Sequence, residues 1–135
     1  MPSVKRCLFC AVICVIFLHG CASAQKRSDQ DASLAELAEQ YWTKRLVEKD
    51  YKFTYNLELE KKSLSFSEYC ERVKRSQKFN CFSVKTKEVT IEGDKGIVCL
   101  TLECRMPFLP KPYALPINDV WLYESNRWKH KFLHK

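Results

Sequence analysis

The spacing of apolar residues changes once along this chain, near Lys78. Before that point apolar positions recur every three or four residues, which predicts helices. The first predicted helix opens with a capping box, Ser33-x-x-Glu36, and ends near residue 50. Its apolar face is formed by six residues, Leu34, Leu37, Ala38, Tyr41, Trp42 and Leu46.

Two shorter helices are predicted to follow. The first covers residues 50–59, and three of its side chains are expected to face inward, Tyr51, Phe53 and Leu57. The second is capped by Ser65 or Ser67. Its apolar stripe contains four residues, Phe66, Tyr69, Cys70 and Val73.

Beyond Lys78 apolar and polar residues alternate, which predicts strands. In the first strand Phe82, Val84 and Thr86 share one face, and the pattern resumes after a bulge. Residues 92–96 predict a hairpin loop. The second strand covers residues 97–106 and directs five side chains to one face, Val98, Leu100, Leu102, Cys104 and Met106.

Four prolines interrupt the strand pattern and predict an irregular connection over residues 106–116. Two final strands are predicted over residues 118–124 and 127–133, with a tight turn at Ser125-Asn126 between them. One face of the last strand carries Trp128, His130 and Phe132. Helices followed by a meander of strands predict an α+β fold, with N-terminal helices packed on a four-stranded, mostly antiparallel sheet.

The N-terminal segment predicts export. Lys5 and Arg6 precede an uncharged run over residues 7–18, too short to cross a bilayer as a helix. Leu18-His19-Gly20-Cys21 follows and resembles a lipobox, although His19 departs from its usual small or aliphatic residue. We therefore expect a signal peptide over residues 1–20, a flexible tether over 21–32 and one α+β domain over 33–135.

The resemblance to bacterial lipoproteins implies that Cys21 carries lipid, palmitate included, and that the protein is anchored in the cell envelope. Ala22 after the cysteine implies sorting to the outer membrane, facing the periplasm. Ala22-Ser23-Ala24 also fits an ordinary cleavage site, so a secreted, unlipidated form cut after Ala24 is the alternative.

Charge and cysteine content limit the classes of partner and cofactor expected for this protein. The net charge of +7 is spread along the chain, and export argues against a nucleic-acid partner. A solvated surface is the simplest interpretation of the charge, and attraction to anionic lipid headgroups or cell-wall polymers is the alternative. Four cysteines remain after Cys21 in the mature chain, Cys70, Cys81, Cys99 and Cys104. They form one or two disulfides or stay free thiols. Cys99 and Cys104 face opposite sides of one strand and should not pair, and no spacing predicts a metal site or another cofactor.

Several short motifs resemble nuclear transport factor 2-like (NTF2-like) domains. Ala38-x-x-Tyr41-Trp42 and Asp50-Tyr51 are similar to the first helix of such domains and the "GDY" turn that ends it, with Lys49 in place of the usual glycine. The later strands add Trp121-Leu122-Tyr123-Glu124 and Arg127-Trp128. The resemblance implies a curved sheet wrapped by three helices around a cavity.

The same resemblance raises the question of catalysis, because some members use an Asp or His base beside a Tyr or Asp donor. Asp119 or His130 would be the base here, with Tyr41, Tyr55 or Tyr123 as donor. No active-site motif matches position by position, and we expect His130, between Lys129 and Lys131, to be exposed. Asp50 is better explained as a turn residue.

We therefore expect no enzyme but a module that binds a protein or a small apolar ligand. A small isomerase-like enzyme or a carrier of hydrophobic ligands is the alternative. The residues expected to line a cavity or form a contact surface are aromatic, Tyr41, Trp42, Tyr55, Phe108, Tyr113, Trp121 and Trp128. Phe108 and Tyr113 belong to the proline-rich connection, which is the best candidate contact surface if it is exposed.

Overall fold

The computed structural model describes residues 31–132. The predicted signal peptide, the lipidation site Cys21 and the tether up to residue 30 lie outside the described residues, while residues 31 and 32 are already helical. From Ser33 onward the chain forms one compact unit. Within the described part of the chain, no helix combines the length and the apolar character that a bilayer crossing requires.

The N-terminal helix covers residues 31–43 of the described chain and continues as one wider, π-type turn, η1 (Lys44–Glu48). Lys49 ends it with a left-handed backbone, φ 61°. Glycine adopts that conformation without strain, which is a physical reason for the glycine that the sequence resemblance leads one to expect at this point. The Asp50 side chain then accepts a hydrogen bond from the Phe53 backbone N–H at 3.1 Å, so the turn residue also caps the next helix.

The predicted helix over residues 50–59 is split in two. Helix α2 covers Tyr51–Leu57, and a 3-10 turn, η2, covers Leu59–Lys62. The break falls at Glu58, whose backbone is extended (φ −67°, ψ 136°). Within α2 the fully buried side chain is Thr54, whereas Phe53 and Leu57 are only half-buried.

Helix α3 covers Phe66–Ser76 and begins with a reciprocal capping box between Ser65 and Glu68, which resolves the choice between the two serines. Tyr69 and Val73 are buried, as its stripe predicted. Phe66 was also expected in the stripe, but it is 43% exposed, because it lies at the first position of the helix.

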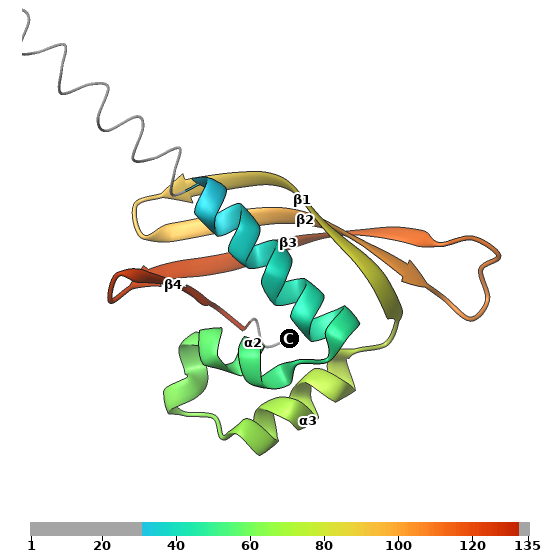
Figure 1. Cartoon of the computed structure of the whole chain (residues 1–135), viewed down its shortest axis with the longest axis horizontal. Coiled ribbons are helices and arrows are strands. Elements are labelled where there is room, and N and C mark those ends of the chain that lie inside the picture. Colours follow the sequence, from blue (N-terminus) through green and yellow to red (C-terminus); the bar gives the residue numbers. More distant parts are fainter. Residues whose placement is uncertain (1–30, 133–135) are drawn as a thin grey trace, which may run out of the picture. The chain divides into compact units, whose positions relative to one another are not determined.

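Four antiparallel strands form one sheet in the order β1-β2-β3-β4, and the N-terminal helix runs across one face of it (Figure 1). The strands are β1 (Asn80–Glu92), β2 (Lys95–Arg105), β3 (Tyr113–Glu124) and β4 (Arg127–His130). The predicted α+β class is therefore confirmed. The alternation predicted for β2 also holds, since its inward residues Val98, Leu100, Leu102 and Cys104 are all buried.

Two details of the strands differ from the predictions. A bulge between Cys81 and Ser83 reverses the alternation locally, so Cys81 is buried and Phe82 is 43% exposed. Strand β3 begins at Tyr113, not near residue 118, and continues through Pro116. In the described structure β4 pairs with β3 only over Trp121–Glu124. The edge of β3 at Pro116 is therefore unpaired, and a residue without an N–H is tolerated there.

The helix approaches the sheet closely at Gly96. A Cβ placed there would lie 2.3 Å from a methyl carbon of Leu34 and 3.3 Å from the Trp128 ring. Both of those side chains are buried in the core shared by the helix and the sheet. The absence of a side chain at residue 96 therefore lets the helix lie against β2.

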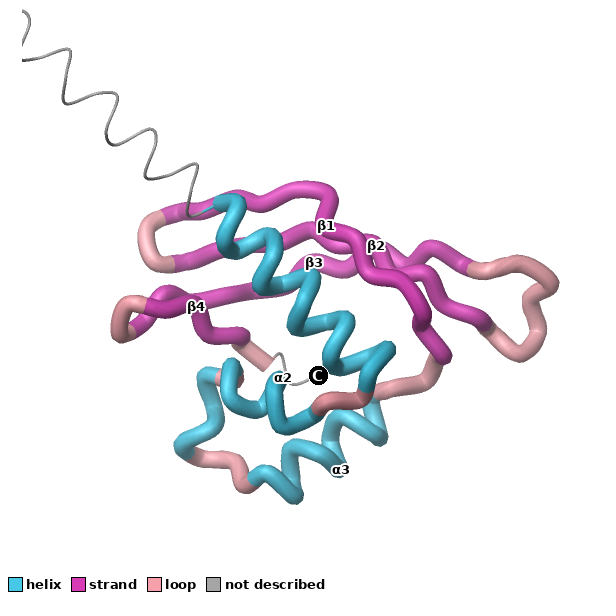
Figure 2. The backbone as a smooth tube through the Cα atoms, viewed as in Figure 1, coloured by secondary structure: helices cyan, strands magenta, loops and turns pink. Residues whose placement is uncertain are grey.

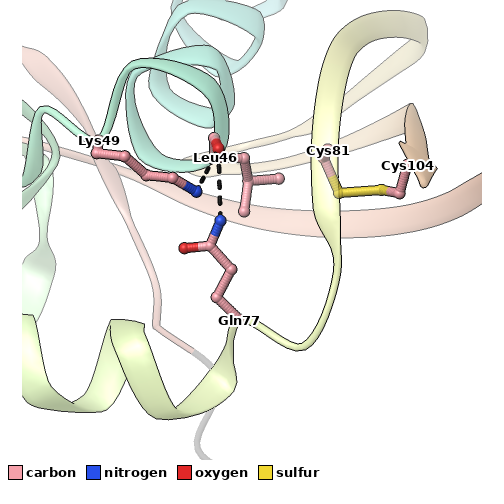
Figure 3. The surroundings of a disulfide bond; sticks show 5 residues. All are labelled: Leu46, Lys49, Gln77, Cys81 and Cys104. Atoms are coloured by element: carbon pink, nitrogen blue, oxygen red, sulfur yellow. Dashed lines mark hydrogen bonds between the residues drawn. A yellow bond between two sulfur atoms is a disulfide. The ribbon is translucent and has the colours of Figure 1, made fainter. Parts of the chain in front are cut away.

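A disulfide joins β1 to β2 near the end of the sheet where the N-terminal helix stops (Figure 3). It links Cys81 to Cys104, while Cys70 and Cys99 are free thiols. The expectation that Cys99 and Cys104 do not pair is thus confirmed. Beside this disulfide, the carbonyl oxygen of Leu46 accepts hydrogen bonds from Lys49 Nζ (2.6 Å) and Gln77 Nε2 (3.4 Å), which satisfies one of the free carbonyls at the helix end.

Candidate functional site

Two ionisable residues lie on the inner face of β3 and β4, where aliphatic side chains would be the ordinary choice. Asp119 is 4% exposed and His130 is 3% exposed. The expectation that His130 is exposed is therefore wrong. The alternation of β4 places His130 on the same inward face as Trp128, and its position between two lysines does not change that direction.

Each ring nitrogen of His130 lies within hydrogen-bond distance of a carboxylate. Nε2 is 2.8 Å from Asp119 Oδ1, and Nδ1 is 2.9 Å from Glu58 Oε2. Glu58 reaches the ring because the break between α2 and η2 brings its extended backbone into a single bridge with His130. Burial alone would lower the pKa of His130, but Asp119 and Glu58 together outweigh burial and raise it to about 9.

The other oxygens of the two carboxylates are also occupied. Asp119 Oδ2 accepts from the indole N–H groups of Trp42 (2.7 Å) and Trp121 (2.8 Å). Glu58 Oε1 accepts from the Tyr41 hydroxyl. Buried carboxylates are stable only when their lone pairs are met in this way.

The network continues from Tyr41 to a buried cation. The Tyr41 hydroxyl accepts a hydrogen bond from Arg45 Nη1 at 2.9 Å, and burial raises the pKa of Tyr41 well above its usual value. We call Tyr41, Arg45, Glu58, Asp119 and His130 the His130 network. Two cations, Arg45 and His130, balance two carboxylates, Glu58 and Asp119, so the buried group is neutral overall.

This geometry limits the chemistry of the histidine. An imidazolium that donates to two carboxylates has no free lone pair, and the raised pKa of His130 favours this protonated form at neutral pH. Neither Asp119 nor Glu58 is free to accept a proton from a substrate without losing a partner inside the core.

A pocket of about 650 Å³ opens beside the network. Its walls come from the N-terminal helix and η1, from α3, and from β3 and the chain at the end of β4. The residues that line it are Trp42, Arg45, Arg72, Arg75, Ser76, Ile117, Asn118, Asp119, His130, Lys131 and Phe132. The charges of the His130 network balance one another. The rest of the pocket wall adds the cations Arg72, Arg75 and Lys131 and the apolar surfaces of Trp42, Ile117 and Phe132.

Arg45 connects the network to the pocket. It is 5% exposed, and its guanidinium lies 5.0 Å from the Trp42 ring centre and 4.8 Å from that of Phe132. A guanidinium carries five N–H donors. Among the described residues only the Tyr41 hydroxyl accepts a hydrogen bond from it. Because Arg45 lines the pocket, its remaining N–H donors are available to a ligand there.

The predicted site residues lie in four different places. Tyr41, Trp121 and Trp128 are buried in the core, and Trp42 lines the pocket. Tyr55 lies apart from the network and donates to the Leu64 carbonyl at 2.6 Å. Phe108 and Tyr113, exposed by 93% and 45%, lie at the far end of β2 and β3.

Of the candidate acid–base residues, the structure brings Asp119, His130 and Tyr41 together and leaves Tyr55 and Tyr123 out. Sequence reasoning missed Glu58 and Arg45. Arg45 could have been found, because it follows Tyr41 by one helical turn on the same face. No local pattern marks Glu58. Among residues 31–132, no group of three or more His, Cys, Asp and Glu side chains is placed to hold a metal ion.

Comparison with known proteins adds the fold. Neither a protein-family model nor a curated protein matches this sequence. Nine chains of solved structures do match. One, from Campylobacter jejuni, is described as a candidate NTF2-like transpeptidase; it aligns with a TM-score of 0.51 and 11% identity, over 73% of this chain and 96% of the other. The fold is NTF2-like. At this identity the similarity extends to the fold alone.

Proposed function

We propose that this NTF2-like domain is a non-enzymatic binding module, and that its pocket takes a small organic anion with a flat apolar body. The observation that carries the proposal is Arg45, a buried guanidinium with a single hydrogen-bond acceptor among the described residues, at the wall of a 650 Å³ pocket. A carboxylate is the natural partner for such a group, because a guanidinium fork matches its two oxygens.

The remaining walls support the same ligand class. Arg72, Arg75 and Lys131 add positive charge around the opening, and Trp42 and Phe132 offer aromatic surface. Aromatic and basic groups together favour a ligand that pairs an anionic head with an apolar body. The charges of Asp119 and His130 do not oppose such a ligand, since the two groups neutralise each other.

Acyl transfer, suggested by the description of the Campylobacter jejuni structure, is less well supported. Such chemistry needs a nucleophile activated by a base. Among the described residues that line the pocket, Ser76 is the hydroxyl-bearing one, and its Oγ donates to the Val73 carbonyl at 2.8 Å. The free thiols Cys70 and Cys99 do not line the pocket. We therefore favour binding over catalysis.

The ligand class can be tested with a matched pair of probes, 2-naphthoate and its neutral analogue 2-naphthamide. Their effect on the indole N–H signal of Trp42 in the full chain is measured by NMR, with the buried Trp128 as internal reference. We expect naphthoate to bind about tenfold more tightly than the amide. Equal affinity for the two probes, or an unshifted Trp42 signal at millimolar naphthoate, would contradict the proposal.

Two variants localise the effect. Replacing Arg75, an exposed residue of the pocket wall, by alanine should weaken naphthoate binding about threefold by removing one nearby cation. Arg105→Ala, which removes an exposed cation outside the pocket, should leave the affinity unchanged. If both variants have the same effect, the attraction comes from overall charge and not from this pocket.

We further propose that the domain is held in the bacterial cell envelope by lipid on Cys21. The Leu18-His19-Gly20-Cys21 motif supports this, and two or more acyl chains would make the attachment firm. The intact mass of the protein from membranes of its own host tests it. A chain that begins at Cys21 and carries acyl mass is expected, whereas an unlipidated chain that begins at Gln25 would establish a secreted protein.

A further inference from the structure

The connection between β2 and β3 carries the most exposed apolar residues of the described chain. Phe108 is 93% exposed, Leu109 48% and Tyr113 45%. The loop projects beyond the helices at the end of the sheet opposite the β1–β2 and β3–β4 turns (Figures 1 and 2). Three prolines within residues 107–112 restrict the backbone, so these side chains are held out with little freedom left to lose on binding.

One more ring extends this surface on the neighbouring strand. Phe82 is 43% exposed, because the bulge in β1 turns it outward, and the guanidinium of Arg105 lies 5.4 Å from its ring centre. Arg105 and Lys111 are themselves exposed. We call these residues the tip: Phe82, Arg105, Phe108, Leu109, Lys111 and Tyr113.

The connection at the tip carries positive charge. Residues 104–113 contain Arg105 and Lys111 and no aspartate or glutamate. The adjoining acidic residue, Glu103 on β2, is exposed and lies between Ser83 of β1 and Ala114 of β3. The tip therefore combines exposed apolar side chains with two cations, and its acidic neighbour lies on the strand behind the loop.

We propose that the tip docks on an anionic lipid bilayer, with Phe108 and Leu109 inserted between the headgroups and Arg105 and Lys111 contacting the phosphates. Exposed aromatic and leucine side chains flanked by cations are the combination that binds membrane interfaces. Arg105 and Lys111, with no acidic residue between positions 104 and 113, provide the charge complementarity. This inference uses a different part of the molecule from the pocket and does not depend on the proposed function.

The test must read the tip locally, because the apolar run over residues 7–18 can bind lipid by itself. Hydrogen exchange of the full chain is measured with phosphatidylcholine vesicles and with vesicles that contain about 30% phosphatidylglycerol. We expect exchange of residues 104–113 to slow about threefold with the anionic vesicles only. Addition of about 0.5 M NaCl should reverse part of the effect.

A double variant, Phe108→Ser with Leu109→Ser, should abolish the protection, whereas Phe66→Ser, which removes an exposed phenylalanine on α3, should retain it. The proposal is overturned if the vesicles bind the chain while exchange over residues 104–113 stays unchanged. It is also overturned if the same protection appears without lipid as protein concentration rises, since the tip would then bind a second copy of the chain.

Discussion

The inner face of the sheet is held in two different ways. Over β2 the N-terminal helix packs on aliphatic side chains, Val98, Leu100 and Leu102, all nearly inaccessible to solvent. Over β3 and β4 the same face carries Asp119 and His130, which are stable there only because each charge has a partner. In the aliphatic half, over β2, a smaller side chain should lower stability in proportion to the apolar contacts removed. In the charged half, over β3 and β4, loss of any one ionised side chain leaves its partner buried without a counter-charge.

The largest effect should follow from removing one carboxylate. Asp119→Ala leaves His130 with one acceptor and two indole N–H groups with none, so we expect a loss of about 3–5 kcal/mol in the free energy of unfolding. Urea denaturation at pH 7 measures it. Lys85→Ala, which breaks an exposed pair with Glu39 and leaves the hydrogen bond from the Thr86 N–H to Glu39 in place, is the control and should cost about 1 kcal/mol or less.

The two halves should differ in their response to pH. The pKa of His130 is raised to about 9 in the folded protein, against about 6.5 when unfolded. A raised pKa means that the stabilisation is complete below pH 6.5 and is lost as the pH rises through 9. The loss is on the order of 3 kcal/mol.

Urea denaturation at several pH values between 6 and about 9.5 measures this slope. Leu100→Ala removes a buried side chain of the aliphatic half and should lower stability by about 2–5 kcal/mol at every pH, with the slope unchanged. Asp119→Ala should flatten the slope. A wild-type protein equally stable at both ends of the range would show that His130 is not held as a cation.

The disulfide should stabilise the aliphatic half by an amount no larger than the His130 contribution. Cys81 and Cys104 are 23 residues apart in sequence, and closing a loop of this length stabilises the fold by about 3 kcal/mol in the chain-entropy model, with measured values often lower. Thermal unfolding with and without reductant tests this. Replacing Cys99, a free thiol, by serine should not change the response to reductant.

The smallest predicted effect concerns the turn between the N-terminal helix and α2. Lys49 has a left-handed backbone, so Lys49→Gly should stabilise the protein by about 0.5–1 kcal/mol. Part of this gain is offset, because the variant loses the hydrogen bond from Lys49 Nζ to the Leu46 carbonyl. Lys74→Gly within α3 should have the opposite sign, about 1 kcal/mol of destabilisation. Destabilisation by both changes would show that the Lys49 side chain matters more than its backbone.

Local patterns predicted the aliphatic half well. The helices, the four strands and the inward face of β2 follow from periods of about 3.6 and 2, and the opposite directions of Cys99 and Cys104 follow from the strand geometry. The boundary of β3 was missed because Pro116 reads as a strand breaker when the pairing edge is unknown.

The charged half could not be predicted in the same way. His130 and Glu58 are 72 residues apart, and Trp42 and Asp119 are 77 apart, so no window of sequence contains both partners. Alternation placed His130 on the same face as Trp128, but a charged residue between two lysines suggested exposure while its partners were unknown. A cavity with Trp42 in its wall was expected, but the cations of the pocket were missed for the same reason, since they come from η1, α3 and the end of β4.

The charge and the proton positions of His130 provide the most direct test of this interpretation. Its ring nitrogens in the ¹⁵N-labelled full chain are followed by NMR as the pH is raised, and comparison with a His130→Gln variant distinguishes them from His19 and His134. We predict an imidazolium with both nitrogens protonated at pH 7 and a pKa of about 9. A ring that is neutral at pH 7, with a pKa at or below its ordinary value, would contradict the locked network and would return His130 to the role of an available base.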